Sequence, residues 1–320
     1  MPGDRPRVLI AEPNDFSPVA QAILGEVADV HLEAWTTDRL REALETFDVF
    51  WFRLAWRIGR EVLAEPLRCR YLAVPATGLD HIDLVTCAER GIRVLSLKGE
   101  TEFLRTVRAT AELTIALMLG VMRRLPAACD HVLEGGWDRD RFRGTELHGK
   151  KIGLVGMGRL GSLVAGFLKA FGAEVVGFDK RPDFPLRLAE RVESLNNLLS
   201  ECDLVSVHLT YDDSTKNFFG RQEFAAMKPG SVFINTSRGG IVDEPALIEA
   251  LKSGHLAGAG VDVVQGEPFV DTSHCLVGFA RNHPNLLITP HIGGNTVESF
   301  EKTEVFLAKR LVQSLTAKAN

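Results

Sequence analysis

The sequence predicts an α/β protein with two Rossmann-like domains, each built on a parallel sheet. Short apolar runs alternate with amphipathic stretches along almost the whole chain, a pattern typical of βα units. A long apolar segment at about 106–125 separates a first series of these units from a second one. The final stretch, ESFEKTEVFLAKRLVQSLTAK, has helical spacing. We therefore expect a discontinuous first domain over residues 1–100 and 294–320, completed by the C-terminal helix, and a second domain over 101–293.

Composition narrows the class of protein. A chain of 320 residues is typical of roughly two domains, and its net charge of −5 gives no overall attraction for nucleic acid or an anionic membrane. No run approaches the ~20 apolar residues that a membrane span needs, and the polar N-terminus does not resemble a signal peptide. The five cysteines are scattered, without CxxC or metal-ligand spacing. We expect reduced thiols, a cytoplasmic location, and no metal, nucleic acid or membrane partner.

The clearest motif lies at 151–179, KIGLVGMGRLGSLVAGFLKAFGAEVVGFD. An apolar strand leads into GxGxxG, an amphipathic helix follows, and a second strand ends in an acid. In such a unit the first glycine permits a tight turn, the second lets the backbone approach a pyrophosphate at the helix N-terminus, and the third allows close packing of helix and strand. The acid accepts hydrogen bonds from the ribose. The predicted dinucleotide-binding residues of this unit are Gly156, Gly158, Arg159, Leu160, Gly161 and Asp179.

The acid also bears on the type of cofactor. Asp179 would repel the 2′-phosphate of NADP, which favours NAD, although Lys180 and Arg181 follow it and could partly offset that repulsion. A methyltransferase that binds S-adenosylmethionine uses a similar loop and acid. The third glycine, Gly161, favours a dinucleotide over that alternative.

Three polar residues follow strand-like runs of the second series. Arg238 follows SVFINTS, Glu267 follows GVDVVQG, and His291 follows NLLITP. Each has an ordinary alternative, as a surface arginine, a solvated glutamate or a hydrogen-bonded structural histidine. Ligands of doubly wound sheets, however, bind beyond the carboxyl ends of the strands, where all three are expected.

Together these residue types suit reduction of a 2-oxo acid or oxidation of a 2-hydroxy acid. Hydride transfer to a ketone leaves negative charge on its oxygen, which needs a proton and electrostatic stabilisation. A histidine can supply the proton near neutral pH, and a neighbouring carboxylate fixes its tautomer. An arginine can hold the ketone oxygen and an adjacent carboxylate with its planar fork.

Several segments resemble the NAD-dependent D-isomer-specific 2-hydroxyacid dehydrogenases. They are NTSRGGIVDEPALIEAL, GVDVVQGEP and TPHIGG, while GGWDRDRFRGTELHGKKIGLVGMGRLG is similar to the phosphoglycerate dehydrogenase branch in its short form. The resemblance implies that His291 is the general acid/base, Glu267 its partner and Arg238 the cation that orients the substrate. It further implies that Asp262 contacts the nicotinamide carboxamide and that His208 and Thr215 line the cofactor site.

The resemblance assigns substrate binding to the first, flavodoxin-like domain. VPATGLDHID is similar to a loop whose backbone N–H groups hold the substrate carboxylate, which implies roles for Thr77, Gly78 and Leu79. Arg53, in WFRLAWR, matches an arginine that faces the anionic end of the substrate in relatives. The alternative for Arg53 is a solvated arginine on an edge strand.

The chain departs from this family pattern in several places. Ala76 replaces a common glycine, and Trp56 is bulky where the phosphoglycerate branch has small residues. Arg105 and Arg108 precede the long apolar segment in place of the usual asparagine-containing sequence, and they suggest a substrate with a second anionic group, such as a phosphate, phosphonate or carboxylate. We do not expect the C-terminal regulatory domains of long phosphoglycerate dehydrogenases.

Two classes of function remain open from the sequence. The first is an NAD-dependent D-2-hydroxyacid dehydrogenase. The second is an NAD-sensing, non-catalytic binding protein similar to transcriptional corepressors. Some relatives of this kind keep the same three polar residues. In either case GGWDRDRFRG resembles a dimerisation arm, and Trp137 and Phe142 in it predict a homodimer.

Overall fold

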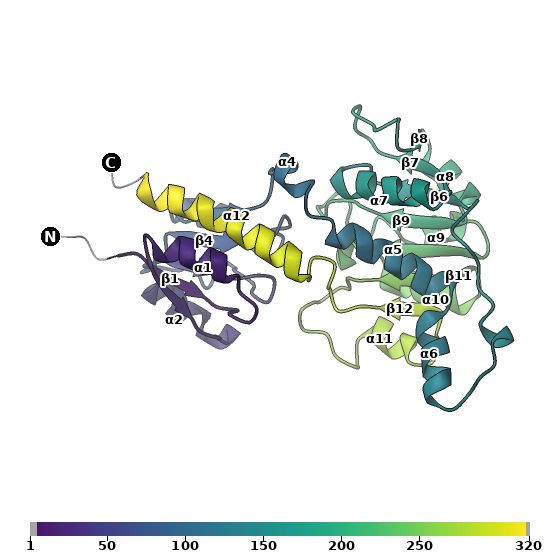
Figure 1. The fold of residues 1–320 in the computed structure, drawn as a ribbon, viewed down its shortest axis with the longest axis horizontal. Coiled ribbons are helices and arrows are strands. Elements are labelled where there is room, and N and C mark those ends of the chain that lie inside the picture. Colours follow the sequence, from purple (N-terminus) through teal and green to yellow (C-terminus); the bar gives the residue numbers. More distant parts are fainter. Residues whose placement is uncertain (1–4, 318–320) are drawn as a thin grey trace. The chain divides into compact units, whose positions relative to one another are not determined.

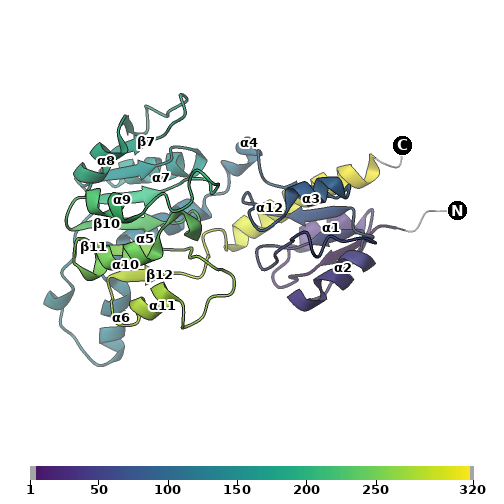
Figure 2. The same ribbon diagram turned by 180° about the vertical axis from the view of Figure 1, so that it is seen from behind.

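The computed structural model describes residues 5–317, which form two compact units (Figures 1 and 2). The first unit runs to Val107, beyond the expected boundary at residue 100, and resumes at Asn295. The second unit is Arg108–Gly294. Each unit contains its own sheet, and all pairings between strands are parallel. The predicted fold class is confirmed.

The first unit has a five-stranded sheet in the order β2-β1-β3-β4-β5, the order of flavodoxin-like sheets. Its strands are β1 (Arg7–Ile10), β2 (Asp29–Leu32), β3 (Val49–Trp51), β4 (Tyr71–Val74) and β5 (Arg93–Ser96). Its helices are α1 (Pro18–Gly25), the 3-10 turn η1 (Thr37–Arg39), α2 (Leu40–Thr46), α3 (Leu84–Glu89), α4 (Thr101–Leu104) and α12 (Val297–Thr316).

Successive strand residues of this sheet face two separate cores. On β1, Val8 and Ile10 face one core and Leu9 faces the other, as the two-residue period of a strand requires. The C-terminal helix α12 packs along α1, and Leu307 and Leu311 reach the same core as Val8 (Figure 1). The prediction that this helix completes the first, discontinuous domain is therefore confirmed.

The second unit has a seven-stranded sheet in the order β12-β11-β10-β9-β6-β7-β8. Its strands are β6 (Lys151–Val155), β7 (Glu174–Phe178), β8 (Glu190–Arg191), β9 (Leu204–Val207), β10 (Ser231–Asn235), β11 (Leu256–Val261) and β12 (Leu286–Ile288). The order reverses at β6, which lies between β7 and β9, and ligands of doubly wound sheets bind at such a point.

Helices cover both faces of this second sheet (Figure 2). They are α5 (Ala109–Met122), α6 (Leu125–Leu133), η2 (Asp140–Phe142), α7 (Arg159–Ala170), α8 (Leu195–Glu201), α9 (Arg221–Ala226), η3 (Gly239–Ile241), α10 (Glu244–Lys252) and α11 (Cys275–Ala280). Helices α5 and α7 share one core with Leu154 and Ile234, whereas α8, α9 and α10 share the other with Val207 and Phe233.

The long apolar segment at 106–125 is the buried helix α5. It packs on α7, β10 and β11 within the second unit, and its residues are apolar on most sides, as expected of an enclosed helix. Among the described helices, none combines the length and the hydropathy that a bilayer span requires.

Candidate functional site

The glycine-rich turn joins β6 to α7 as the motif predicts. Gly156 has φ +97°, a conformation that L side chains rarely adopt, and a Cβ there would lie 2.5 Å from the His208 carbonyl oxygen. A Cβ on Gly161 would lie 2.1 Å from the Gly156 carbonyl oxygen. Both positions therefore require glycine for close packing of the turn.

Gly158 differs from the other two glycines because space is left beside it. The nearest atom to a Cβ at this position is Nη2 of Arg181, at 3.6 Å. Gly158 is the N-cap of α7, and the first turn of that helix carries no acidic residue. A pyrophosphate can thus approach the backbone N–H groups and the positive end of the helix dipole.

Asp179 follows β7 and lies directly beside this turn. Its carboxylate accepts hydrogen bonds from the backbone N–H of Met157 (2.8 Å) and of Arg181 (2.9 Å), and the Arg181 guanidinium adds an ion pair at 3.0 Å. Burial opposes ionisation, but the hydrogen bonds and charge of Arg181 prevail and lower the pKa of Asp179. An ionised carboxylate, a glycine cradle and a helix N-terminus fit the adenosine half of a dinucleotide.

His208 lies at the end of β9, under the same turn. Its Nε2 is 3.0 Å from Ser206 Oγ, and its buried Nδ1 has no hydrogen-bond partner among residues 5–317. Burial lowers the pKa of His208 to about 4, so the ring is neutral at pH 7. Thr215 contributes its hydroxyl to the neighbouring loop, where it donates to the Thr210 carbonyl oxygen at 2.8 Å.

The structure brings His291 and Glu267 together. The His291 Nδ1 is 2.7 Å from Glu267 Oε2, and each side chain is about one quarter exposed, at 24% and 26%. A carboxylate at Nδ1 fixes the ring in the tautomer that has a proton on Nδ1 and leaves Nε2 for another partner. This is the arrangement in which an imidazole exchanges a proton with a bound substrate.

His291 has an unusual backbone conformation, with φ +53°. A non-glycine residue in this region costs roughly 1–3 kcal/mol and persists only where its surroundings fix it. The backbone N–H of His291 donates to the carbonyl oxygens of Asp262 (2.8 Å) and Thr289 (3.0 Å). The histidine therefore lies in a tightly bonded turn rather than at the end of a free strand.

Asp262 holds this turn, a role that the sequence did not reveal. Its buried carboxylate accepts from the Thr289 hydroxyl (2.6 Å), the Ile292 N–H (2.8 Å) and the Gly293 N–H (2.7 Å). Burial raises the pKa of Asp262, and these hydrogen bonds oppose the rise. The only signal in the sequence was a single acid directly after an apolar strand.

Arg238 follows β10 and precedes η3. Its Nη1 donates to the Ser237 carbonyl oxygen (2.8 Å), and its own carbonyl oxygen accepts from Asn235 Nδ2 (3.0 Å). A Cβ on the next residue, Gly239, would lie 2.1 Å from the Val264 carbonyl carbon. The backbone after Arg238 therefore touches the segment that leads into Glu267.

The predicted carboxylate loop lies in the first unit, after β4. Among residues 5–317, no group accepts a hydrogen bond from the backbone N–H groups of Thr77, Gly78 or Leu79, whereas the flanking N–H of Ala76 donates to the Val74 carbonyl oxygen (2.8 Å). Three successive N–H donors of this kind can hold an anion.

Arg53 follows β3, which is the central strand of the first sheet, so the edge-strand alternative is wrong. Its guanidinium forms a 2.8 Å ion pair with the fully buried Glu304 of α12 and stacks on Phe300, with 4.1 Å from Cζ to the ring centroid. The structure thus shows Arg53 joining β3 to α12.

The departures from the family pattern have different structural settings. Trp56 is 1% exposed and belongs to the core of the first unit. Arg105 lies in the first unit, where it forms an exposed ion pair with Glu102 at 2.8 Å, whereas Arg108 begins the second unit.

Comparison with known proteins agrees with this geometry. Residues 115–293 match the family model of the NAD binding domain of D-isomer specific 2-hydroxyacid dehydrogenases. The chain is 32% identical to D-3-phosphoglycerate dehydrogenase of Methanocaldococcus jannaschii over 97% of its length, which is 57% of that protein. It is 31% identical to hydroxypyruvate reductase of Thermotoga maritima, over 97% of this chain and 99% of the relative.

A solved structure gives the same relationship. D-lactate dehydrogenase of Aquifex aeolicus, complexed with NAD and lactic acid, superposes with a TM-score of 0.84 at 26% identity, over 97% of this chain and 96% of the other. The chain spans only a little over half the length of the phosphoglycerate dehydrogenase it matches, and nearly all of the hydroxypyruvate reductase.

Proposed function

Because the chain belongs to the D-isomer specific 2-hydroxyacid dehydrogenase family, we propose that it interconverts a 2-oxo acid and the D-2-hydroxy acid with NAD. The observation that carries the proposal is the His291–Glu267 pair at 2.7 Å in the same unit as the NAD-binding turn. Corepressor-like relatives can keep the same polar residues, so this pair supports catalysis without excluding them, and the assay below decides between the two classes.

The NAD-binding residues are those of the glycine-rich turn, Asp179 and the strand end at His208. When bound, NAD supplies the acceptor or donor of a hydride. Asp179 would receive the ribose hydroxyls, and the N–H groups at the start of α7, including those of Arg159 and Leu160, would hold the pyrophosphate. Thr215 and Asp262 are further proposed contacts of NAD. Asp262 would accept a hydrogen bond from the nicotinamide carboxamide with a carboxylate lone pair that the His291 turn does not use.

His291 carries the proton in the proposed reaction. In reduction, Nε2 donates its proton to the oxygen of the ketone as negative charge develops there, and in oxidation it takes the proton back. Glu267 keeps the imidazole oriented and stabilises its protonated form during the cycle. Arg238 would orient the ketone oxygen and the adjacent carboxylate through its planar guanidinium.

We also propose that the substrate carboxylate binds the free N–H groups of Thr77, Gly78 and Leu79 in the first unit. Arg53 would contribute positive charge to the same unit, although its ion pair with Glu304 already uses Nη2 of the guanidinium. Arg105 and Arg108 support a substrate with a second anionic group. If pyruvate or glyoxylate is turned over as well as 2-oxo acids that carry a phosphate or a second carboxylate, the proposal of a second anionic group is refuted.

The decisive assay follows NADH absorbance with a panel of 2-oxo acids, for wild type and for His291→Gln. We expect the variant to bind NADH, measured by its fluorescence, and to lose turnover by on the order of 10² to 10⁴. The matched control is His283→Gln, because among residues 5–317 the His283 ring forms a hydrogen bond only with the Phe279 carbonyl oxygen of α11, and it stacks on the Phe279 ring. Wild-type turnover in His291→Gln would refute the mechanism, and NADH binding without turnover of any 2-oxo acid would favour the corepressor-like alternative.

A homodimer and a cytoplasmic location complete the proposal. Leu133 and Trp137, on and after α6, are 86% and 89% exposed, which is unusual for such large apolar side chains. Light scattering after gel filtration should give twice the chain mass for wild type and a lower mass for Trp137→Asp. The five cysteines are all free thiols, as in proteins of a reducing compartment.

A further inference from the structure

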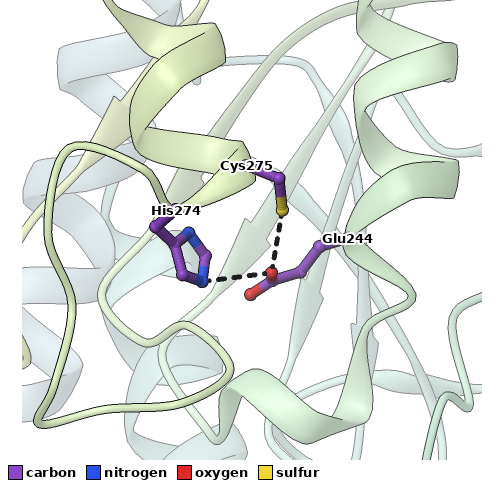
Figure 3. Close-up of side chains that lie close together, drawn as sticks. All are labelled: Glu244, His274 and Cys275. Carbon is purple, nitrogen blue, oxygen red and sulfur yellow. Dashed lines mark hydrogen bonds and ion pairs between the residues drawn. The ribbon is translucent and has the colours of Figure 1, made fainter.

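A second group of reactive side chains lies in the second unit, away from the glycine-rich turn. It consists of Glu244 at the start of α10 and of His274 and Cys275 at the start of α11 (Figure 3). One ligand atom of each residue lies within 4.8 Å of the others. We call these three residues the Glu244 cluster.

The atoms of the Glu244 cluster converge on one carboxylate oxygen. Oε2 of Glu244 is 3.3 Å from Cys275 Sγ and 3.3 Å from His274 Nε2, and Figure 3 shows the three side chains pointing toward one another. The carboxylate is buried at 4% exposure, the imidazole is mostly buried, and the thiol side is open. A cation thus has access from one side to a largely enclosed set of donors.

The chemistry of the donors selects the class of cation. Thiolate, imidazole and carboxylate together suit a borderline metal such as Zn²⁺ and disfavour Mg²⁺ or Ca²⁺, which prefer oxygen ligands. Three protein ligands leave a fourth tetrahedral position for water, or for the carbonyl oxygen of Gln265, which is 3.0 Å from His274 Nε2.

We propose that the Glu244 cluster is a binding site for Zn²⁺ or a similar borderline divalent cation. On binding, the Cys275 S–H bond breaks, its proton leaves to solvent, and a sulfur electron pair forms the bond to the metal. Nε2 of His274 carries the proton that it donates to the Gln265 carbonyl oxygen. It loses this proton to solvent while Nδ1, which has no hydrogen-bond partner among residues 5–317, takes one up, so the neutral imidazole presents its Nε2 lone pair to the metal. Glu244 gives Oε2, the oxygen that accepts from the Cys275 thiol before the metal binds. No oxidation or reduction takes place.

The Glu244 cluster is also connected to the loop that carries Glu267. The other carboxylate oxygen of Glu244 accepts from the Gln265 backbone N–H (2.6 Å), and Gln265 Nε2 donates to the Val242 carbonyl oxygen (2.7 Å). Gln265 is only two residues before Glu267. A cation that joins Glu244 to α11 would therefore hold both ends of the segment 265–275 and restrict its motion.

The test uses the full chain without a polyhistidine tag, after chelator treatment, titrated with Co²⁺ and then Zn²⁺. We expect one Co²⁺ per chain with a thiolate-to-cobalt charge-transfer band, which Zn²⁺ abolishes. Cys275→Ser and His274→Ala should each weaken binding by more than about 100-fold, since loss of a partner that only supports a ligand already costs about 10- to 100-fold. Cys129→Ser, which removes an exposed cysteine of α6, should bind as wild type does.

Several results would overturn the proposal. They are the absence of the charge-transfer band in wild type, its survival in Cys275→Ser, or its loss in Cys129→Ser. Hydrogen exchange tests the connection to Glu267: Zn²⁺ should slow exchange of the Gln265 amide in wild type and leave it unchanged in His274→Ala. Unaltered exchange in a zinc-loaded wild type would refute the connection. All these readouts are independent of the proposed dehydrogenase activity.

Discussion

Replacement of Asp262 by asparagine separates two roles for this residue. As a contact of the nicotinamide carboxamide, Asp262 would act on cofactor affinity. As the holder of the His291 turn, it would act on stability and on the chemical step. The structure favours the second role, because three hydrogen bonds of 2.6–2.8 Å from Thr289, Ile292 and Gly293 already reach its carboxylate.

The size of the effect follows from these bonds. Oδ1 accepts two of them and Oδ2 accepts the third, from the Gly293 N–H. An asparagine oxygen can keep the first two, but its NH₂ group would then face the Gly293 N–H, donor against donor. Loss of one hydrogen bond to a charged group costs about 1.5–3 kcal/mol. Removal of a buried charge offsets part of that cost, so we expect a net loss of about 2 kcal/mol.

Thermal unfolding and kinetics measure the two consequences. In a unit of this length, Arg108–Gly294, each 1 kcal/mol shifts Tm by about 2–4 °C, which predicts a fall of roughly 4–8 °C. Displacement of the imidazole by ~1 Å should lower kcat by on the order of 10²-fold, with nearly unchanged affinity for NADH. Asp271→Asn is the control, since within the described part of the chain that exposed carboxylate accepts hydrogen bonds only from Ser273. An unchanged Tm with weakened NADH binding would contradict the reasoning.

Three further predictions concern individual side chains. His208 has a folded-state pKa of about 4, below its unfolded value of 6.5. Its contribution to the free energy of unfolding is therefore complete above pH 6.5 and is lost as pH falls toward 4. Urea unfolding should show a loss of about 2 kcal/mol between pH 7.5 and pH 5, and this loss should be absent in His208→Gln. Arg53→Ala leaves the buried Glu304 without its cation and should destabilise the first unit by about 3–5 kcal/mol in thermal melts. Arg105→Ala removes an exposed ion pair and should change stability by less than about 0.5 kcal/mol. Equal effects of the two substitutions would refute the distinction between a buried and an exposed pair. Asp179→Ser removes the repulsion of a 2′-phosphate and leaves Arg181 to bind it, so the ratio of kcat/KM for NADH over NADPH should fall about tenfold or more. Lys228→Ala removes a cation that pairs with Asp203 and should leave that ratio nearly unchanged.

The sequence predicted the fold because the two periodicities that define it are local. Buried parallel strands give short apolar runs such as VFI within SVFIN, and the helices between them show one apolar face. The glycine-rich turn was predictable for the same reason, since the demands on Gly156 and Gly161 arise within one βαβ unit.

The rest of the site depends on contacts between residues distant in the sequence. The positive φ of His291 and the bonds from its turn to Asp262, about 30 residues earlier, leave no periodic trace. Arg53 shows the same limit. Its position after an apolar run was apparent, but its partner Glu304 lies 251 residues further along the chain. The Glu244 cluster likewise joins two helix starts and has no local metal-ligand spacing.

The residues that hold His291 and Glu267 in place both lie on the segment that follows β11. Asp262, the first residue after that strand, fixes the His291 turn, and Gln265, three residues later, is held by Glu244 ahead of Glu267. The 2.7 Å bond between imidazole and carboxylate is therefore set by two separate attachments to one short segment of the second unit. Proton transfer depends steeply on such distances, so both attachments bear on the proposed reaction. The bonding of Asp262 and Gln265 thus accounts for the orientation of the imidazole that we propose as the general acid.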